Sequence, residues 1–238
     1  MIIGAILAGG QGTRFGGDLP KQFLPLGDKP VLCHSLVQFA ACESIDHIFV
    51  VVPQDRIAFT EALIAPHVGT AAVTVIAGGT DRTGSLLCVL QAVDERFGAA
   101  DDHVVITHDA ARPFISQRML ADNIEAATRM GACGTAMPMV DSIIRSADGT
   151  TIGEMPDRTQ FFKMQTPQTF RMGLLKACFA KLTDAQKAAL TDGCNVCRLA
   201  GEPVEMVRGS DYNLKITTVA DWRLAQMILD GGLADDDA

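Results

Sequence analysis

Glycines and cations are concentrated in residues 7–23, LAGGQGTRFGGDLPKQF, which follow a short apolar run. Glycines in such a place let the backbone adopt positive φ angles and bring its N–H groups close to a ligand, because no β-carbon intervenes. Arg14 and Lys21 stand toward the two ends of the segment, where they could bracket a chain of phosphates. The composition favours a phosphate-binding loop. The alternative is a glycine-rich surface loop with two solvated cations.

Two known phosphate-binding patterns do not fit this segment. A dinucleotide fingerprint requires Gly-x-Gly-x-x-Gly at the opening of a helix, but Phe15 stands where the third glycine is needed and Pro20 interrupts any helix. A Walker loop requires a glycine before its lysine, and that glycine is missing before Lys21. A Rossmann dehydrogenase is therefore disfavoured.

Asp109 directly follows the apolar run HVVITH and is expected at the carboxyl end of a strand, where open α/β sheets bind ligands. Magnesium binds a few carboxylates together with phosphate oxygens and water, so this single aspartate suffices for a metal site. The alternative role of Asp109 is to cap a turn before Pro113. His108 is expected to be a packed strand residue rather than a ligand.

Two further cations depend on the elements that carry them. Lys215 lies in NLKIT, which has the pattern of a strand, and an inward-pointing cation there would require an anion. The alternative is an exposed strand face. Arg158 lies in MPDRTQF and by itself reads as a solvated arginine.

Short apolar runs alternate with segments of helical spacing in the first half of the chain. The runs are apolar on both faces, so buried strands joined by right-handed helical crossovers are expected. The predicted fold is α/β, a Rossmann-like, mostly parallel sheet with helices on both faces. The expected strands are residues 2–8, 47–53, 72–78 and 103–109, and the expected helices are residues 30–42, 54–66, 82–97 and 116–131.

The second half of the chain departs from this alternation. Residues 132–170 alternate apolar and polar side chains around an ADGT turn, which is typical of an extended excursion or hairpin. We expect a protruding β-arm over about 138–165 whose partner surface could be a second copy of the chain. Residues 171–190 are then expected to be helical, 203–217 to form one or two strands and 218–230 a last helix. No linker interrupts the sequence, so a single domain over residues 1–238 is expected.

Composition excludes several classes of partner. The formal charge of −8 and the pI of about 5.0 disfavour nonspecific binding to nucleic acid or to an anionic membrane. No apolar run is long enough to span a bilayer, and no signal peptide is evident at the start. The seven cysteines are odd in number and scattered, which suits a reducing cytoplasm. The Cys194-x-x-Cys197 pair lacks the further ligands that a zinc site needs.

Five segments in order resemble the signatures of one family. They are LAGGQGTRFGGDLPKQF, THDAARPF, QTPQTF, TDG and NLKITT. They resemble the cytidylyltransferases that activate polyol phosphates, namely 2-C-methyl-D-erythritol 4-phosphate and D-ribitol 5-phosphate. The resemblance implies a nucleotide-binding α/β sheet, a homodimer made by protruding β-arms, CTP and Mg²⁺ as co-reactants, and release of pyrophosphate. The segments FFKMQTPQTF and GEPVEMVRGSDYNLKITT resemble the ribitol 5-phosphate branch more closely, and the methylerythritol branch is the alternative.

The resemblance also assigns roles to particular residues. The catalytic cations are Arg14, Lys21 and Lys215, and the metal-binding carboxylate is Asp109. Positions that contact the nucleotide are Ala8, Gly9, Gly10, Gly12, Gly79, Arg82, Ser85 and Ala110. Positions that bind the polyol phosphate or complete the phosphate site are Arg112, Ser142, Arg158, Thr166 and Thr191. Ser142 and Thr80 depart from the residues common in the family, a threonine and an acidic residue.

In the implied reaction, the phosphate of the sugar alcohol attacks the α-phosphorus of CTP and pyrophosphate departs. Two anions must meet, so the site must supply positive charge at the transition state. A phosphate nucleophile is already deprotonated near neutral pH, and no general base is expected. Two other classes are weighed against this one. A sugar-1-phosphate nucleotidyltransferase should lack the HDAARPF and QTPQ segments, and a noncatalytic nucleotide-binding regulator would bind CTP without turnover.

Overall fold

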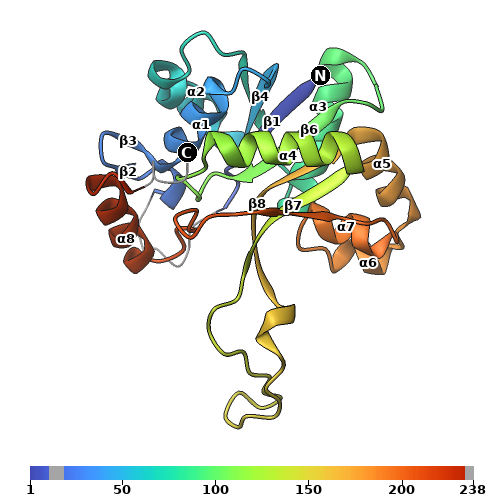
Figure 1. Cartoon of the computed structure of the whole chain (residues 1–238). Coiled ribbons are helices and arrows are strands. Elements are labelled where there is room, and N and C mark those ends of the chain that lie inside the picture. The colour runs from blue at the N-terminus through green and yellow to red at the C-terminus, as the bar shows by residue number, and fades with distance from the viewer. Residues whose placement is uncertain (11–18, 234–238) are drawn as a thin grey trace.

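The computed structural model describes residues 1–10 and 19–233, and its centre is a seven-stranded sheet (Figure 1). The strands lie in the order β5, β4, β1, β6, β8, β7, β9. Strand β8 runs antiparallel to both of its neighbours, and the other neighbouring pairs are parallel, which confirms the mostly parallel sheet. The bounds are β1 Ile2–Leu7, β4 His47–Val52, β5 Val73–Ala77, β6 Val104–Asp109, β7 Ala132–Pro138, β8 Phe162–Arg171 and β9 Glu205–Arg208.

The strand order reverses beside β1. From β1 the chain crosses to β4 and then β5 on one side, and it returns past β1 to β6 on the other side. In open α/β sheets, the connections that leave two such strands in opposite directions open a crevice outside their carboxyl ends. The carboxyl ends of β1 and β6 therefore mark the expected place for a ligand.

Helices cover both faces of the sheet, as the sequence predicted. Side chains of β4 alternate between the two cores: Phe49 and Val51 pack with α3, α5 and α7, whereas Ile48 and Val50 pack with α1, α2 and α4. Such alternation follows from the two-residue period of a strand. The bounds are α1 Val31–Ala41, α2 Ile57–Ile64, α3 Arg82–Phe97, α4 Gln117–Met130, α5 Met172–Lys181, α6 Asp184–Ala188, α7 Gly193–Leu199 and α8 Val219–Asp230.

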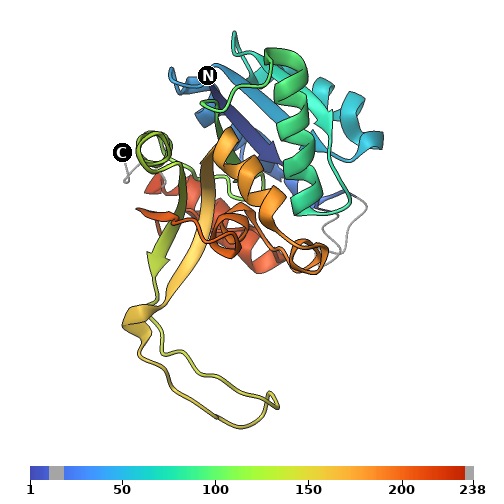
Figure 2. The ribbon, with the colours of Figure 1, turned by 90° about the vertical axis from the view of Figure 1, so that its right-hand side faces the viewer.

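A long arm projects from the body between β7 and β8 (Figures 1 and 2). Within residues 139–161 the backbone forms one isolated bridge, between Arg145 and Glu154, and a short 3₁₀ helix, η5, over Arg158–Gln160. Val140, Ile152 and Met155 are exposed along it. The excursion is thus an arm as predicted, but most of it is irregular rather than a regular hairpin.

Several element predictions need correction. The predicted helix at 54–66 consists of α2 between two 3₁₀ helices, η3 Gln54–Arg56 and η4 Ala65–His67. The predicted helix at 171–190 is interrupted before Thr183, whose side chain caps α6. Three further elements were not predicted from the sequence: α7, the 3₁₀ helix η2 at Lys21–Phe23, and the short hairpin of β2, Pro25–Leu26, and β3, Lys29–Pro30.

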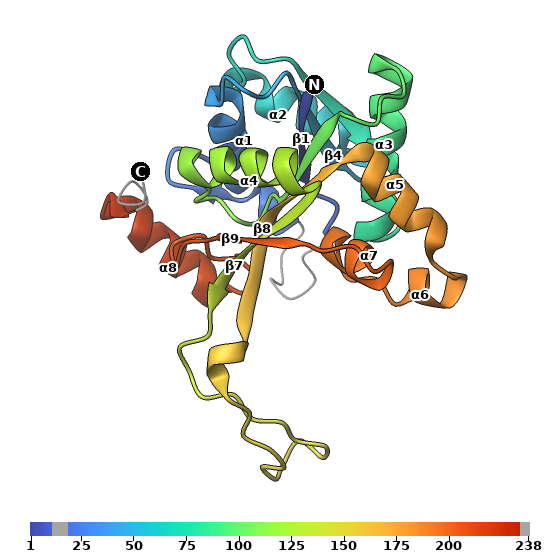
Figure 3. The ribbon, with the colours of Figure 1, turned by 45° about the vertical axis from the view of Figure 1, so that its right-hand side comes forward.

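The segment carrying Lys215 is not a strand. The described residues of 203–217 contain one strand, β9, and the chain is irregular from Gly209 to Thr217. The segment does not pair regularly with the sheet, because Ile216 N–H donates to the carbonyl of Ala111 in a loop and Asn213 uses its side chain to bind neighbouring backbone. Helix α8 follows, with Thr218 as its N-cap, and lies at one side of the molecule (Figure 3). It contacts β2.

Two other features bear on the expectations from composition. Across residues 1–10 and 19–233, no helix combines the length and apolar character needed to cross a membrane. All seven cysteines are free thiols. Cys194 and Cys197 are both buried on α7, and burial raises their pKa values.

Candidate active site

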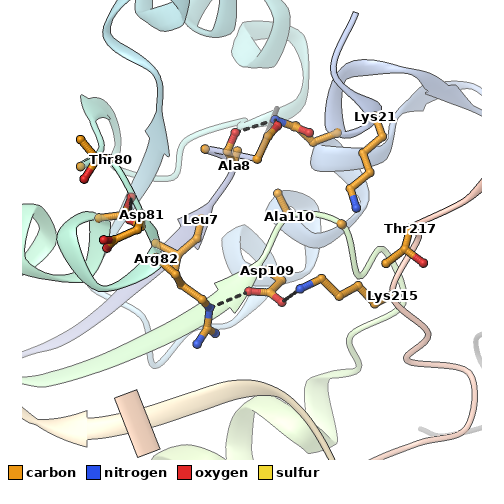
Figure 4. Close-up of a pocket in the computed structure, with 16 residues that line it drawn as sticks. Leu7, Ala8, Lys21, Thr80, Asp81, Arg82, Asp109, Ala110, Lys215 and Thr217 are labelled. Carbon is orange, nitrogen blue, oxygen red and sulfur yellow. Dashed lines mark hydrogen bonds and ion pairs between the residues drawn. The ribbon is translucent and has the colours of Figure 1, made fainter. Parts of the chain in front are cut away.

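One cavity of about 630 Å³ lies at the carboxyl ends of β1 and β6, beside the start of α3 (Figure 4). Three cations and two carboxylates are among its described lining side chains, so the cavity is locally positive although the chain is acidic overall. Ten of the residues singled out from the sequence line it: Ala8, Gly9, Gly10, Lys21, Gly79, Arg82, Ser85, Asp109, Ala110 and Lys215.

The first wall of the cavity is the backbone that leaves β1. Ala8 N–H donates to the carbonyl of Val51 at 2.7 Å, which extends the sheet contact by one residue. Beyond Gly10, the predicted Gly12 and Arg14 lie outside the described residues. The chain returns at η2, and Lys21 points into the cavity (Figure 4).

The second wall is the start of α3. Asp81 caps this helix by accepting a hydrogen bond from Gly84 N–H at 2.7 Å, and Ser85 Oγ donates to the carbonyl of Asp81 at 2.9 Å. Gly79 passes so close that an added β-carbon would lie 2.5 Å from the carbonyl carbon of Gly84. Only glycine therefore lets this backbone approach the helix. The N-terminus of a helix carries partial positive charge, which suits an anionic ligand.

The third wall is the carboxyl end of β6, and Asp109, the last residue of that strand, lies at its centre. Its Oδ1 accepts a hydrogen bond from Arg82 Nε at 3.2 Å and its Oδ2 accepts one from Lys215 Nζ at 2.7 Å (Figure 4). Burial opposes ionisation of this carboxyl group, but the charges of Arg82 and Lys215 outweigh it and hold the pKa of Asp109 well below its ordinary value. The carboxylate is therefore ionised and positioned by two cations from distant parts of the chain.

A chain of buried hydrogen bonds holds the backbone of Asp109 in place. Asp109 N–H donates to Thr166 Oγ1 at 3.1 Å, and the Thr166 hydroxyl lies 3.0 Å from His108 Nδ1. His108 Nε2 lies 3.0 Å from the carbonyl of Arg112, which can only accept, so Nε2 carries the proton and Nδ1 accepts from Thr166. Burial lowers the pKa of His108 to about 4 and keeps the ring neutral.

The irregular segment that bears Lys215 is fixed by Asn213. The Asn213 side chain is fully buried, and its Nδ2 donates to the carbonyl of Thr166 at 2.8 Å and to Gln165 Oε1 at 3.2 Å. Arg112 Nη1 in turn donates to the carbonyl of Asn213 at 2.7 Å. These contacts place Lys215 against Asp109 although no strand carries it.

Five predicted substrate residues do not line the cavity. Ser142 and Arg158 lie on the arm, where Arg158 Nη1 donates to the carbonyl of Val140. Thr191 is exposed just before α7. Thr166 and Arg112 lie behind Asp109, in the supporting contacts described above. The roles assigned to these five residues stay predictions.

Sequence reasoning missed residues that also line the cavity. Gln22, Asp81, Ala111 and Thr217 were not assigned to it, and Thr80 was noted only as a departure. Two of them carried a usable signal: Asp81 is an N-cap residue directly before a predicted helix, and Gln22 directly follows Lys21. The pairing of Arg82 with Asp109 had no local signal, because the partners are 27 residues apart.

Comparisons with known proteins extend over nearly the whole chain. Residues 2–231 match the family described as IspD, 2-C-methyl-D-erythritol 4-phosphate cytidylyltransferase. A protein of Lactiplantibacillus plantarum named ribitol-5-phosphate cytidylyltransferase is 42% identical over 231 residues, which are 97% of this chain and 99% of that protein.

Solved structures agree with the sequence comparison. The 4-diphosphocytidyl-2C-methyl-D-erythritol synthase of Anaerococcus prevotii matches with a TM-score of 0.82 at 26% identity, covering 96% of both chains. The 2-C-methyl-D-erythritol 4-phosphate cytidylyltransferase of Francisella tularensis matches with a TM-score of 0.78 at 28% identity, covering 95% of this chain and 98% of that one.

Proposed function

This chain belongs to the 2-C-methyl-D-erythritol 4-phosphate cytidylyltransferase family, and from that premise we propose that it transfers the cytidylyl group of CTP to D-ribitol 5-phosphate. It is a nucleotidyltransferase that acts on a polyol phosphate. The choice of ribitol rests on the 42% identity to the ribitol-5-phosphate relative, against 26% and 28% to the two structures named for methylerythritol. The second candidate acceptor is 2-C-methyl-D-erythritol 4-phosphate, the substrate in the description of the family.

The single observation that carries the chemistry is the placement of Lys21, Arg82 and Lys215 around one cavity with Asp109. In the proposed reaction, an oxygen of the acceptor phosphate forms a bond to the α-phosphorus of CTP, and the bond from that phosphorus to the bridging oxygen of pyrophosphate breaks. Charge accumulates on the phosphate oxygens at the transition state. In other enzymes, removing a single preorganised hydrogen-bond donor to such charge raises the barrier by about 2.7–4 kcal/mol.

No proton needs to be removed from the acceptor, because its phosphate is ionised near neutral pH. We therefore assign binding and charge stabilisation to the cavity and no general base. Lys21 and Lys215 supply compact charges, and Arg82 forms one side of the nucleotide site. Both Lys215 and Arg82 are held in place by Asp109. Arg14 is proposed as a further cation for the phosphates.

Enzymes of this family use a divalent metal ion, and we propose Mg²⁺ bound through Asp109. The residues fit such an ion: Asp109 is ionised, and each of its oxygens keeps a lone pair beyond its contact with a cation. The described residues contain no cluster of three or more possible ligands, and magnesium in nucleotide sites takes its remaining ligands from phosphates and water. When bound, the ion would neutralise phosphate charge.

The arm is proposed to join two copies of the chain in a homodimer. Val140, Ile152 and Met155 are exposed by 74%, 64% and 65%, and apolar side chains gathered on a projecting segment favour a partner surface. We propose that Ser142 and Arg158 contribute to the polyol phosphate site of the partner.

The free cysteines support a location in a reducing compartment, which we propose to be the cytoplasm. We also propose that the chain works as one domain.

The test is a pyrophosphate-release assay with CTP, Mg²⁺ and either D-ribitol 5-phosphate or 2-C-methyl-D-erythritol 4-phosphate. We expect kcat/KM to be higher for ribitol phosphate, to fall when UTP replaces CTP, and to vanish when EDTA removes the metal. A preference for methylerythritol phosphate would select the second candidate. If neither acceptor leads to pyrophosphate release, the proposal that the protein is this enzyme is refuted.

A further inference from the structure

Gln22 holds two parts of the cavity wall together. It follows Lys21 in η2 and is only 2% exposed, which is rare for a glutamine side chain. Its Nε2 donates to the carbonyl of Ala8 at 2.6 Å and to the carbonyl of Gly10 at 2.8 Å. The first of these bonds is drawn at Ala8 in Figure 4. Both protons of one amide group are thus used on the backbone that leaves β1.

Packing alone does not fix this backbone. Among the described atoms, a β-carbon added at Gly10 would meet nothing within 4 Å, and one added at Gly9 would meet only Ser85 Oγ at 3.8 Å. Consecutive glycines also have the largest conformational freedom to lose. Ala8 is itself buried and its N–H is bonded to Val51. Among the contacts of the described residues, the two hydrogen bonds from Gln22 are those that orient the carbonyl groups of Ala8 and Gly10.

The same bonds orient donors as well as acceptors. In a planar trans peptide, the carbonyl and the following N–H point in opposite directions. Fixing the carbonyl of Ala8 therefore also fixes the direction of the Gly9 N–H group, a donor in the cavity wall. Since Lys21 precedes Gln22 in the same short helix, the bonds also set the position of its backbone relative to the glycines.

We propose that Gln22 is a positioning residue for CTP, which holds the Ala8–Gly10 backbone and Lys21 in the arrangement that binds the nucleotide. This inference rests on the proposed function. The role is chemical rather than a matter of size, because it requires two donors facing two carbonyl oxygens. A carboxylate of the same shape would present only acceptors to them.

The experiment compares Gln22→Glu and Gln22→Met with the parent protein by calorimetric binding of CTP in the presence of Mg²⁺ and absence of acceptor. We expect the Kd for CTP to rise about 10-fold or more in both variants near pH 8. In Gln22→Glu the affinity should recover partly as the pH falls toward about 6. Burial against two carbonyl oxygens should raise the pKa of this carboxyl group above the ordinary value of about 4.3, and the protonated form regains one donor. Gln22→Met should show no such recovery.

A matched control is Gln117→Glu. Gln117 Nε2 likewise donates to a backbone carbonyl, that of Gln38 at 2.7 Å, but on the exposed surface and away from the cavity. This control should bind CTP as the parent does. Thermal unfolding of all variants would show whether each is folded. If Gln22→Glu is unstable, the Kd of Gln22→Met for CTP still tests the role of Gln22.

Kinetics separate positioning from general damage. Pyrophosphate release should show a raised KM for CTP, with the KM for the polyol phosphate within about twofold of the parent value. Equal increases in both KM values, an unchanged Kd for CTP, or no recovery of Gln22→Glu at lower pH would overturn the role of Gln22. A parent protein that binds CTP but releases no pyrophosphate would overturn the proposed function alone, and one that binds no CTP would overturn both.

Discussion

At the scale of single residues, the site depends on a buried carboxylate that remains charged. Asp109 keeps its charge because Arg82 and Lys215 contact its two oxygens, and those cations in turn are fixed by the carboxylate. An ion pair of this kind is costly to break from one side only, because the remaining charge is left without a partner. Substitutions here should therefore affect both catalysis and stability.

Lys215→Met tests the cation that contacts Asp109 most closely, at 2.7 Å. We expect kcat to fall by about 10²–10³-fold, because one fixed charge near the reacting phosphates is lost. The control is Lys176→Met, which removes an ion pair of similar length, 2.6 Å from Asp94, between α5 and α3. Steady-state pyrophosphate release would measure both. A comparable loss of kcat in the two variants would contradict the role of Lys215.

The neutral state of His108 gives the fold a specific pH dependence. Its pKa is about 4 in the folded protein, whereas an unfolded imidazole titrates near 6.5. Between these values the unfolded chain binds a proton that the folded chain does not. The free energy of unfolding should therefore decrease as the pH falls from about 6.5 to about 4, by about 3 kcal/mol from this residue.

His108→Gln removes this titration while keeping a donor and an acceptor. Urea unfolding at several pH values should show a shallower loss of stability between about pH 6.5 and 4 than in the parent. The control His67→Gln changes a partly buried histidine, the last residue of η4, and should keep the parent's slope. An unaltered slope in His108→Gln would show that the folded and unfolded chains bind the His108 proton equally well, which would contradict the lowered pKa.

At the scale of elements, local patterns were predicted better than long-range contacts. The first four parallel strands and α3 agree with the sequence because hydrophobic periodicity is a local signal. The segment of Lys215 was wrongly read as a strand, because its position depends on Asn213 and on residues about a hundred positions earlier. The family and the class of reaction were predicted from five ordered motifs and are confirmed.

Asn213→Asp tests whether that irregular segment positions Lys215. The new side chain has the same shape but presents an acceptor to the carbonyl of Thr166 and to Gln165 Oε1. We expect the free energy of unfolding to fall by about 1–3 kcal/mol and kcat to fall with it, since Lys215 is two residues away. In the control Asn195→Asp, the oxygen that accepts from Arg198 is kept, so stability and kcat should not change. Full activity in Asn213→Asp would contradict this view.

At the scale of the whole molecule, the cavity and the projecting arm are separate features, because no residue of the arm lines the cavity in the described part of the chain. The cavity lies at the carboxyl ends of the strands, while Ser142 and Arg158 lie on the projecting arm and do not line it. Sequence alone supplied the arm, from alternation and a turn, but it carried no physical signal for which copy of the cavity the arm serves. A homodimer in which each arm completes the partner's site would unite these observations.

Mixing two variants that are each impaired in a different way tests this arrangement directly. Arg158→Ala should raise the KM for the polyol phosphate far more than that for CTP, and Lys215→Met should lower kcat. If the arm serves the partner, a mixed dimer has one site with its own Lys215 and the partner's intact arm. Random exchange makes half of the dimers mixed, each with one active site of two, so unfolding and refolding the two variants together should restore about a quarter of the parent activity at low polyol phosphate concentration. If each arm serves its own subunit, every site in the mixture carries one defect, and the activity will not exceed the average of the two variants measured alone.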